Sequence, residues 1–148
     1  MELMFQWVFQ LHSYWTLLTL SITIFVILNC SFSLIIKKNF KTFDLRLSLY
    51  ALIFNHIQLI IGLILYFLSP KFLWWNNGLK SVIQNPEYRL YLIEHPLANL
   101  LGVLILTLGW SIHKKSPKSS KKFLRIGMFY LGGFIIISPS SSSMVFKT

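Results

Sequence analysis

Charged side chains divide this sequence into four long charge-free runs, and this division constrains the fold more than any other feature. The runs cover residues 3–36, 47–70, 95–113 and 126–146. About 20 apolar helical residues cross a hydrocarbon layer of roughly 30 Å, so each run is long enough to span a bilayer. Only 12% of the residues are charged, against about 25% in an ordinary soluble domain. We therefore expect an all-α integral membrane four-helix bundle, with residues 1–148 forming a single transmembrane domain.

Interface residues place the ends of the four expected spans, at about 8–36, 47–68, 92–112 and 123–138. Between the second and third spans, residues 70–92 combine aromatic anchors with turn residues, as is typical of a segment at headgroup level. Pro96 is expected either to open the third span or to kink it early. A run of serines cuts off the fourth span, which we expect to be short, tilted or partly re-entrant.

The net charge of +10 is concentrated in two places rather than spread along the chain. Ten of the fourteen basic residues follow the first or third span: Lys37, Lys38, Lys41, Arg46, Lys114, Lys115, Lys118, Lys121, Lys122 and Arg125. Both groups therefore lie on one side, and basic loops mark the cytoplasmic side, which places both termini outside. The charge indicates topology and lipid-headgroup contact rather than nucleic-acid binding. No basic region precedes the first span, so we expect it to be retained rather than cleaved as a signal peptide.

Small and polar residues repeat at helical spacing in three of the spans, as is typical of packing seams between membrane helices. The stripe of the first span is His12, Thr16, Thr19, Thr23, Val26, Cys30 and Ser33. The other two are Ser48, Ala51, Asn55, Gln58, Gly62 and Tyr66, and His95, Ala98, Asn99, Gly102, Leu106 and Gly109. We expect the three stripes to meet in the interior of the bundle.

Three histidines lie inside the expected spans, where ionisable side chains are costly and are functional candidates. His12 and His95 lie toward the outer ends of the first and third stripes, whereas His56 lies nearer the midplane. Two imidazoles on facing helices are what a b-type haem requires. Hydrogen bonding across the bundle is the simpler explanation of each such histidine, and spacing leaves every pairing open. His113 adjoins Lys114 and is expected to contact headgroups at the inner interface.

Four further polar residues are expected to support these histidines. Glu94 and Arg89 either orient the neighbouring imidazole or carry protons near the outer surface, or Arg89 simply forms an interfacial ion pair with Glu94 or Glu87. Asn55 and Gln58 are expected to form hydrogen bonds between helices, each worth about 0.6 kcal/mol. The sequence contains no phosphate loop, no Ser/His/Asp arrangement and no carboxylate pair on one helical face, so soluble-type catalysis has no candidates.

Several motifs extend over most of the chain: His12-Ser13, Phe43-Asp44, the stretch 47–70, Arg89 and Glu94-His95-Pro96. Together they resemble a family of short four-helix bacterial membrane proteins labelled cytochrome B or cytochrome-b-like. The resemblance implies haem b held by transmembrane histidines, and the matching positions are His12, His56 and His95. The family's arginine shortly after His-Ser corresponds to Thr16 here, and its Trp-Pro ending is replaced by the serines after Pro139.

Two functions are therefore open. The first is a haem b electron-transfer protein or redox-complex subunit of the bacterial inner membrane, with two of the three histidines on the iron and the third near a propionate or a quinone. The second is a haem-free structural or accessory protein that docks to itself or to a respiratory or other membrane complex. A transporter or channel subunit is less favoured, because the spans lack paired carboxylates and broken helices.

Overall fold

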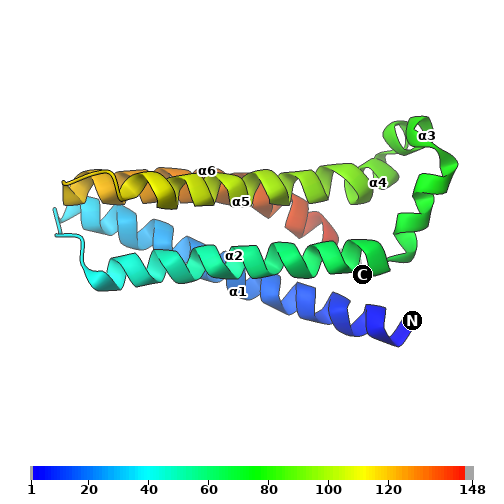
Figure 1. Cartoon of the computed structure of the whole chain (residues 1–148), viewed down its shortest axis with the longest axis horizontal. Coiled ribbons are helices and arrows are strands. Elements are labelled where there is room, and N and C mark those ends of the chain that lie inside the picture. The colour runs from blue at the N-terminus through cyan, green and yellow to red at the C-terminus, as the bar shows by residue number, and fades with distance from the viewer. Residues whose placement is uncertain (1, 146–148) are drawn as a thin grey trace.

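Four long helices make up most of this computed structural model, which describes residues 2–145. They are α1 (Glu2–Ile35), α2 (Thr42–Leu68), α5 (His95–His113) and α6 (Ser119–Val145), and they pack lengthwise as a bundle (Figure 1). Within the described residues the remaining elements are also helical, and there is no β-strand. The expected all-α bundle is confirmed.

Short helical pieces connect α2 to α5 at one end of the bundle. They are the 3₁₀-helix η1 (Pro70–Asn77), α3 (Leu79–Gln84), α4 (Pro86–Arg89) and the π-helical turn η2 (Leu90–Glu94). Pro70 opens η1 and Pro86 opens α4, where proline is favoured because the first helical N–H groups have no partner within the helix. Gly78 separates η1 from α3 with a φ of +83°, a value that glycine adopts without strain.

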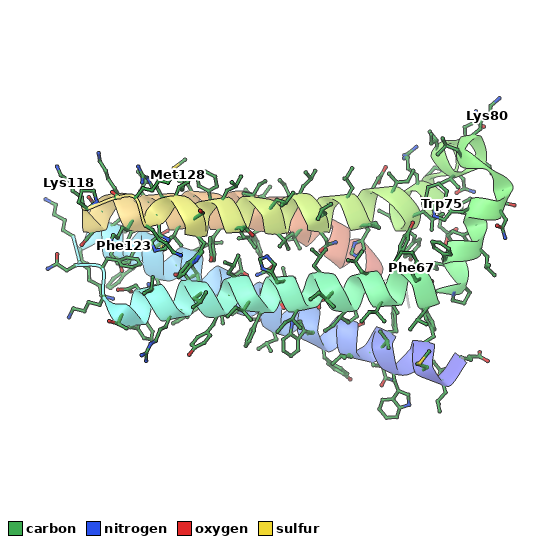
Figure 2. The ribbon with its side chains drawn as sticks, viewed as in Figure 1. Phe67, Trp75, Lys80, Lys118, Phe123 and Met128 are labelled. Atoms are coloured by element: carbon green, nitrogen blue, oxygen red, sulfur yellow. The ribbon has the colours of Figure 1, made fainter. Side chains whose placement is uncertain are left out.

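The long helices have the length and apolarity needed to cross a membrane. The candidate spans are Glu2–Ile35, Thr42–Leu68, Pro86–His113 and Ser119–Pro139. Large apolar side chains cover the outer surface of the bundle, among them Phe67 and Met128, which are more than 60% exposed (Figure 2). Such a surface is unfavourable in water and matches a lipid environment. The chain is a multi-pass membrane protein that contacts the lipid bilayer through these helices.

The two ends of the bundle differ in charge. The connections between α1 and α2 and between α5 and α6 lie at one end, where Lys118 is labelled in Figure 2. Elements η1 to α4, with Lys80, lie at the opposite end, toward which α1 begins and α6 ends (Figure 1). The two basic connections therefore share one end, as expected.

Three polar stripes face the interior. The buried residues of α1 are Thr16, Thr19, Thr23, Val26, Cys30 and Ser33, all members of the predicted stripe. Those of α2 include Ser48, Ala51, Asn55 and Gln58, and those of α5 include Gly102, Leu106 and Gly109. Their predicted inward orientation is confirmed. Asn55 donates hydrogen bonds to Thr23 Oγ1 at 3.0 Å and to Ala51 O at 2.8 Å, which joins α2 to α1.

Glycines allow α5 and α6 to approach closely. A Cβ atom on Gly109 would lie 2.4 Å from the Cβ of Phe129, and one on Gly102 would lie 3.2 Å from the carbonyl oxygen of Gly133. Small residues are favoured at such interfaces because they permit the backbone contacts that hold membrane helices together.

The structure corrects the expectation for His113, at the end of α5. His113 was expected to contact headgroups, but it is buried and packs against the rings of Phe40 and Trp110, at centroid distances of 5.7 and 4.6 Å. Its aromatic neighbours cover it, which adjacency to lysines did not reveal. The fourth span was expected to end at about residue 138. The candidate span is Ser119–Pro139, and α6 as a helix continues to Val145.

A buried carboxylate stabilises the first turn of α2. Asp44 Oδ1 accepts hydrogen bonds from Asn29 Nδ2 at 2.9 Å and from Lys38 Nζ at 3.0 Å. Asp44 Oδ2 accepts from the backbone N–H of Lys41 at 2.9 Å. A negative charge at a helix N-terminus is favourable, and this one also joins α1 to α2.

Candidate functional site

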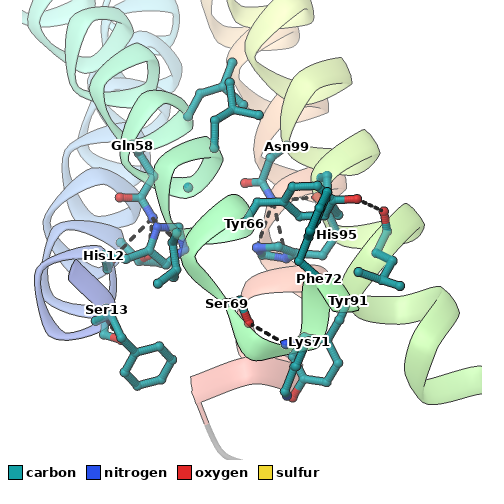
Figure 3. Close-up of a pocket in the computed structure, with 18 of the residues that line it drawn as sticks. His12, Ser13, Gln58, Tyr66, Ser69, Lys71, Phe72, Tyr91, His95 and Asn99 are labelled. Carbon is teal, nitrogen blue, oxygen red and sulfur yellow. Dashed lines mark hydrogen bonds between the residues drawn. The ribbon is translucent and has the colours of Figure 1, made fainter. Parts of the chain in front are cut away.

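A pocket lies between α1, α2, η1, η2 and the start of α5 (Figure 3). Because η1 forms part of its wall, the pocket is at the end of the bundle opposite the two basic connections (Figure 1). Its volume is about 140 Å³. Apolar and aromatic side chains form most of the wall, including Phe5, Phe9, Leu63, Tyr66 and Phe72. Leu63 is also 46% exposed, so the pocket reaches the lipid-facing surface.

Two of the predicted histidines, His12 from α1 and His95 from α5, meet in this pocket. Their ring centroids are 6.3 Å apart, with an angle of 71° between the ring planes. Two imidazoles that share one metal ion place their centroids about 6 Å apart, given a metal–nitrogen bond of about 2 Å. The centroid separation is compatible with two imidazoles on one metal, and it is equally that of an ordinary edge-to-face contact between two rings.

A polar network positions His12. Gln58 Nε2 on α2 lies 3.2 Å from Nδ1 and 3.3 Å from Nε2 of the imidazole, and it also donates to the hydroxyl of Thr16. Thr16 in turn donates to the carbonyl oxygen of His12 at 2.7 Å. Gly62 gives the ring its space, because a Cβ atom there would lie 3.1 Å from His12 Cε1. The predicted role of Gln58 as a hydrogen-bond donor between helices is confirmed.

An equivalent amide accompanies the second histidine. Asn99 Nδ2 lies 3.3 Å from Nδ1 and 3.4 Å from Nε2 of His95, and donates to the His95 carbonyl at 2.8 Å. Asn99 lies one helical turn after His95, so the amide and the ring share one face of α5. Each imidazole is thus accompanied by one carboxamide, Gln58 or Asn99.

Pro96 explains how α2 and the start of α5 are joined beside the pocket. Proline has no N–H to donate to the carbonyl group of Leu92, four residues earlier. The hydroxyl group of Tyr66 on α2 donates to that carbonyl at 3.2 Å, and Trp75 Nε1 donates to the Tyr66 hydroxyl at 2.9 Å. Turns of π-helix are frequent at functional sites, and η2 immediately precedes His95.

His56, the third candidate ligand, lies outside the pocket. Its ring is exposed, with Nδ1 at 2.8 Å from the Leu52 carbonyl and Nε2 at 3.4 Å from Thr107 Oγ1. A carbonyl only accepts hydrogen bonds, so Nδ1 carries the proton in the neutral ring. His56 therefore forms its hydrogen-bond contacts at the exposed surface of the bundle, within α2 and to Thr107 of α5.

The predicted supporting residues divide in the same way. Arg89 Nε lies 2.6 Å from Glu94 Oε1, and both side chains are substantially exposed. This contact matches the interfacial ion pair, one of the two alternatives for these residues. Asn55 bonds α1 rather than lining the pocket, so only Gln58 of the four supporting residues lies in the pocket wall.

Sequence reasoning missed the residues that close the pocket from the headgroup-level segment. Lys71 and Phe72 come from η1, and Tyr91 comes from η2. Lys71 Nζ lies 3.1 Å from the centroid of the Tyr91 ring. These short helices have no extended periodicity that predicts which side chains face inward.

Comparison with known proteins gives no relative for this chain: no family model, no curated protein and no solved structure matches it. In the described part of the chain, no group of three or more His, Cys, Asp or Glu side chains is placed to hold a metal ion. A bare metal ion commonly takes three or four protein ligands, whereas the iron of a bis-histidine haem takes two.

Proposed function

We propose that this protein is a b-type haem protein of the bacterial inner membrane, acting as an electron carrier or as a redox-complex subunit. The observation that carries this proposal is the facing pair of His12 and His95, 6.3 Å apart, in an apolar pocket. The resemblance to cytochrome-b-like membrane proteins and the outward placement of both termini belong to the same proposal.

The residues of the pocket fit haem in their chemistry. His12 and His95 would hold the iron, and the group would supply one-electron transfer when bound. Gln58 and Asn99 would keep the two imidazoles oriented, as hydrogen-bonding neighbours of metal-bound histidines do. The aromatic and aliphatic wall would keep water from the site.

The space within the pocket sets a condition on this proposal. Pockets for drug-sized ligands begin at about 300 Å³, and a porphyrin needs at least as much, whereas this pocket measures about 140 Å³. Haem binding therefore requires the aromatic side chains of the wall, Phe5, Phe9 and Phe72, to rearrange around the His12–His95 pair. None of these three side chains is fully buried, so their rearrangement disrupts little of the core.

A visible spectrum of the purified protein tests the proposal. Expression with ample haem, followed by pyridine haemochrome analysis, is expected to give about one haem b per chain. His12→Ala and His95→Ala should each abolish the signal. His56→Ala is the matched control and should retain it, because His56 lies outside the pocket. A colourless wild-type protein would overturn the haem proposal.

A haem-free structural or accessory role is the second candidate, with docking to another copy or to a larger membrane complex. The hydrogen bonds already made by the histidines favour it, since His12 contacts Gln58 and His56 contacts Leu52. In this case the wild type would be colourless, and His12→Ala would lower the stability of the bundle. The visible spectrum of the wild type separates the two candidates, and thermal unfolding of His12→Ala measures the structural role.

A further inference from the structure

The wall of the pocket contains a cation that no carboxylate balances. Lys71 is its one lysine or arginine, and among the lining residues that the structure describes there is no aspartate or glutamate. The ion pairs found in the described residues are Lys38 with Asp44 and Arg89 with Glu94. The side of the pocket formed by η1 is therefore electropositive.

Local structure holds this lysine in place. Its backbone N–H donates to Ser69 Oγ at 3.2 Å in the first turn of η1. Its ammonium group lies 3.1 Å from the centroid of Tyr91 and 5.6 Å from that of Trp74. Aromatic faces attract an ammonium group but carry no net charge, so they leave the lysine able to pair with an anion.

The remainder of the pocket suits an apolar body attached to that anion. Phe5 and Phe9 come from α1, and Leu63 extends the wall to the lipid-facing surface. A molecule with its acid group at Lys71 can place its apolar part among these side chains and extend into the bilayer. Burial of apolar surface and one charge-assisted contact would then act together.

We propose that the pocket binds an anionic amphiphile by its carboxylate group, with Lys71 as the counter-ion. Haem is one such molecule, because its propionates are carboxylates. For haem as the ligand, this proposal rests on the proposed haem function and adds the residue that binds the propionate. A long-chain fatty acid offers the same chemistry. Lys71 is thus assigned as the residue that distinguishes an acid from its neutral ester.

The test compares acids with their esters on the full-length protein in phosphatidylcholine nanodiscs. The probes are haem and haem dimethyl ester, followed by absorbance, and radiolabelled palmitate and methyl palmitate, followed by equilibrium binding. The variants are Lys71→Met, Lys71→Arg and the control Lys80→Met, an exposed lysine at the same end of the bundle but outside this pocket. Circular dichroism and gel filtration verify that each variant is folded.

Wild type is expected to bind an acid about ten-fold more tightly than its ester, as loss of a charge-assisted hydrogen bond implies. Lys71→Met should reduce this preference to within about two-fold, whereas Lys71→Arg and Lys80→Met should keep it. Equal binding of acid and ester by wild type overturns the role of Lys71, even where haem itself binds. Binding of palmitate through Lys71 without any binding of haem overturns the haem function and supports the anion site. Absence of binding by all four probes overturns both.

Discussion

The hydroxyl group of Tyr66 on α2 donates a hydrogen bond to the backbone carbonyl of Leu92 in η2, across 26 residues of chain. Pro96 has no N–H to donate to this carbonyl. Tyr66→Phe removes the hydroxyl group that donates to it. We expect the free energy of unfolding to fall by about 1 kcal/mol. Unfolding in mixed micelles of dodecylmaltoside and SDS measures the change.

Tyr50→Phe is the matched control for this prediction. Tyr50 lies on the same helix, and its side chain is 52% exposed. Its substitution should change the free energy of unfolding by less than about 0.5 kcal/mol. Equal effects of the two substitutions would show that the Tyr66 hydroxyl does not join α2 to η2.

Close packing of α5 on α6 predicts a large effect of one methyl group. In Gly109→Ala the new Cβ would lie 2.4 Å from the Cβ of Phe129, an atom fixed to the backbone. The helices must separate, at a cost of about 1–3 kcal/mol. Gly132→Ala is the control, because its Cβ would lie 3.9 Å from Ile105 Cγ2, an ordinary contact. Differential scanning fluorimetry should show a lower Tm for the first variant alone.

The buried carboxylate of Asp44 predicts a different pattern at the basic end. Asp44→Asn removes the negative charge of the carboxylate to which Asn29 and Lys38 donate hydrogen bonds. The free energy of unfolding should therefore fall by about 2 kcal/mol. Lys41→Ala should have little effect, because Lys41 contributes its backbone N–H rather than its side chain. Denaturant titration of both variants is the measurement, and a larger loss in Lys41→Ala would contradict the assignment.

Sequence patterns were sufficient to predict the helices and the inward faces. Charge-free runs mark the four long helices because a bilayer excludes charges along its whole thickness. The stripe from His12 to Ser33 could be read from sequence because one helical periodicity persists over the length of α1. Stripes on two helices also placed His12 and His95 toward one cavity, which is where the structure brings them together.

Other features required coordinates because their causes are not local. Lys71 lies in the pocket wall because of the path that the chain takes through η1. No periodic pattern in the sequence predicts that path. His113 is buried by Phe40 and Trp110, of which Phe40 lies in the connection between α1 and α2. Asp44 accepts a hydrogen bond from Asn29 of the preceding helix. Neighbours distant in sequence determine each of these environments.

The charge difference between the two ends predicts the orientation of the chain in the membrane. Basic connections remain on the cytoplasmic side, so Asn77 in η1 should face outward and Pro117, between α5 and α6, should face the cytoplasm. Both residues are exposed. In intact cells a membrane-impermeant maleimide should label Asn77→Cys but not Pro117→Cys, which should react only after permeabilisation.

The native cysteine gives this experiment its background control. Cys30 is the one cysteine of the chain and is 3% exposed, so the unsubstituted protein should remain unlabelled under both conditions. Labelling of Pro117→Cys alone in intact cells would mean that the orientation is the reverse of the predicted one. The side of the bundle that carries Asn77 would then face the cytoplasm. The pocket between α1, α2 and α5 would then open toward the cytoplasm, since η1 supplies part of its wall.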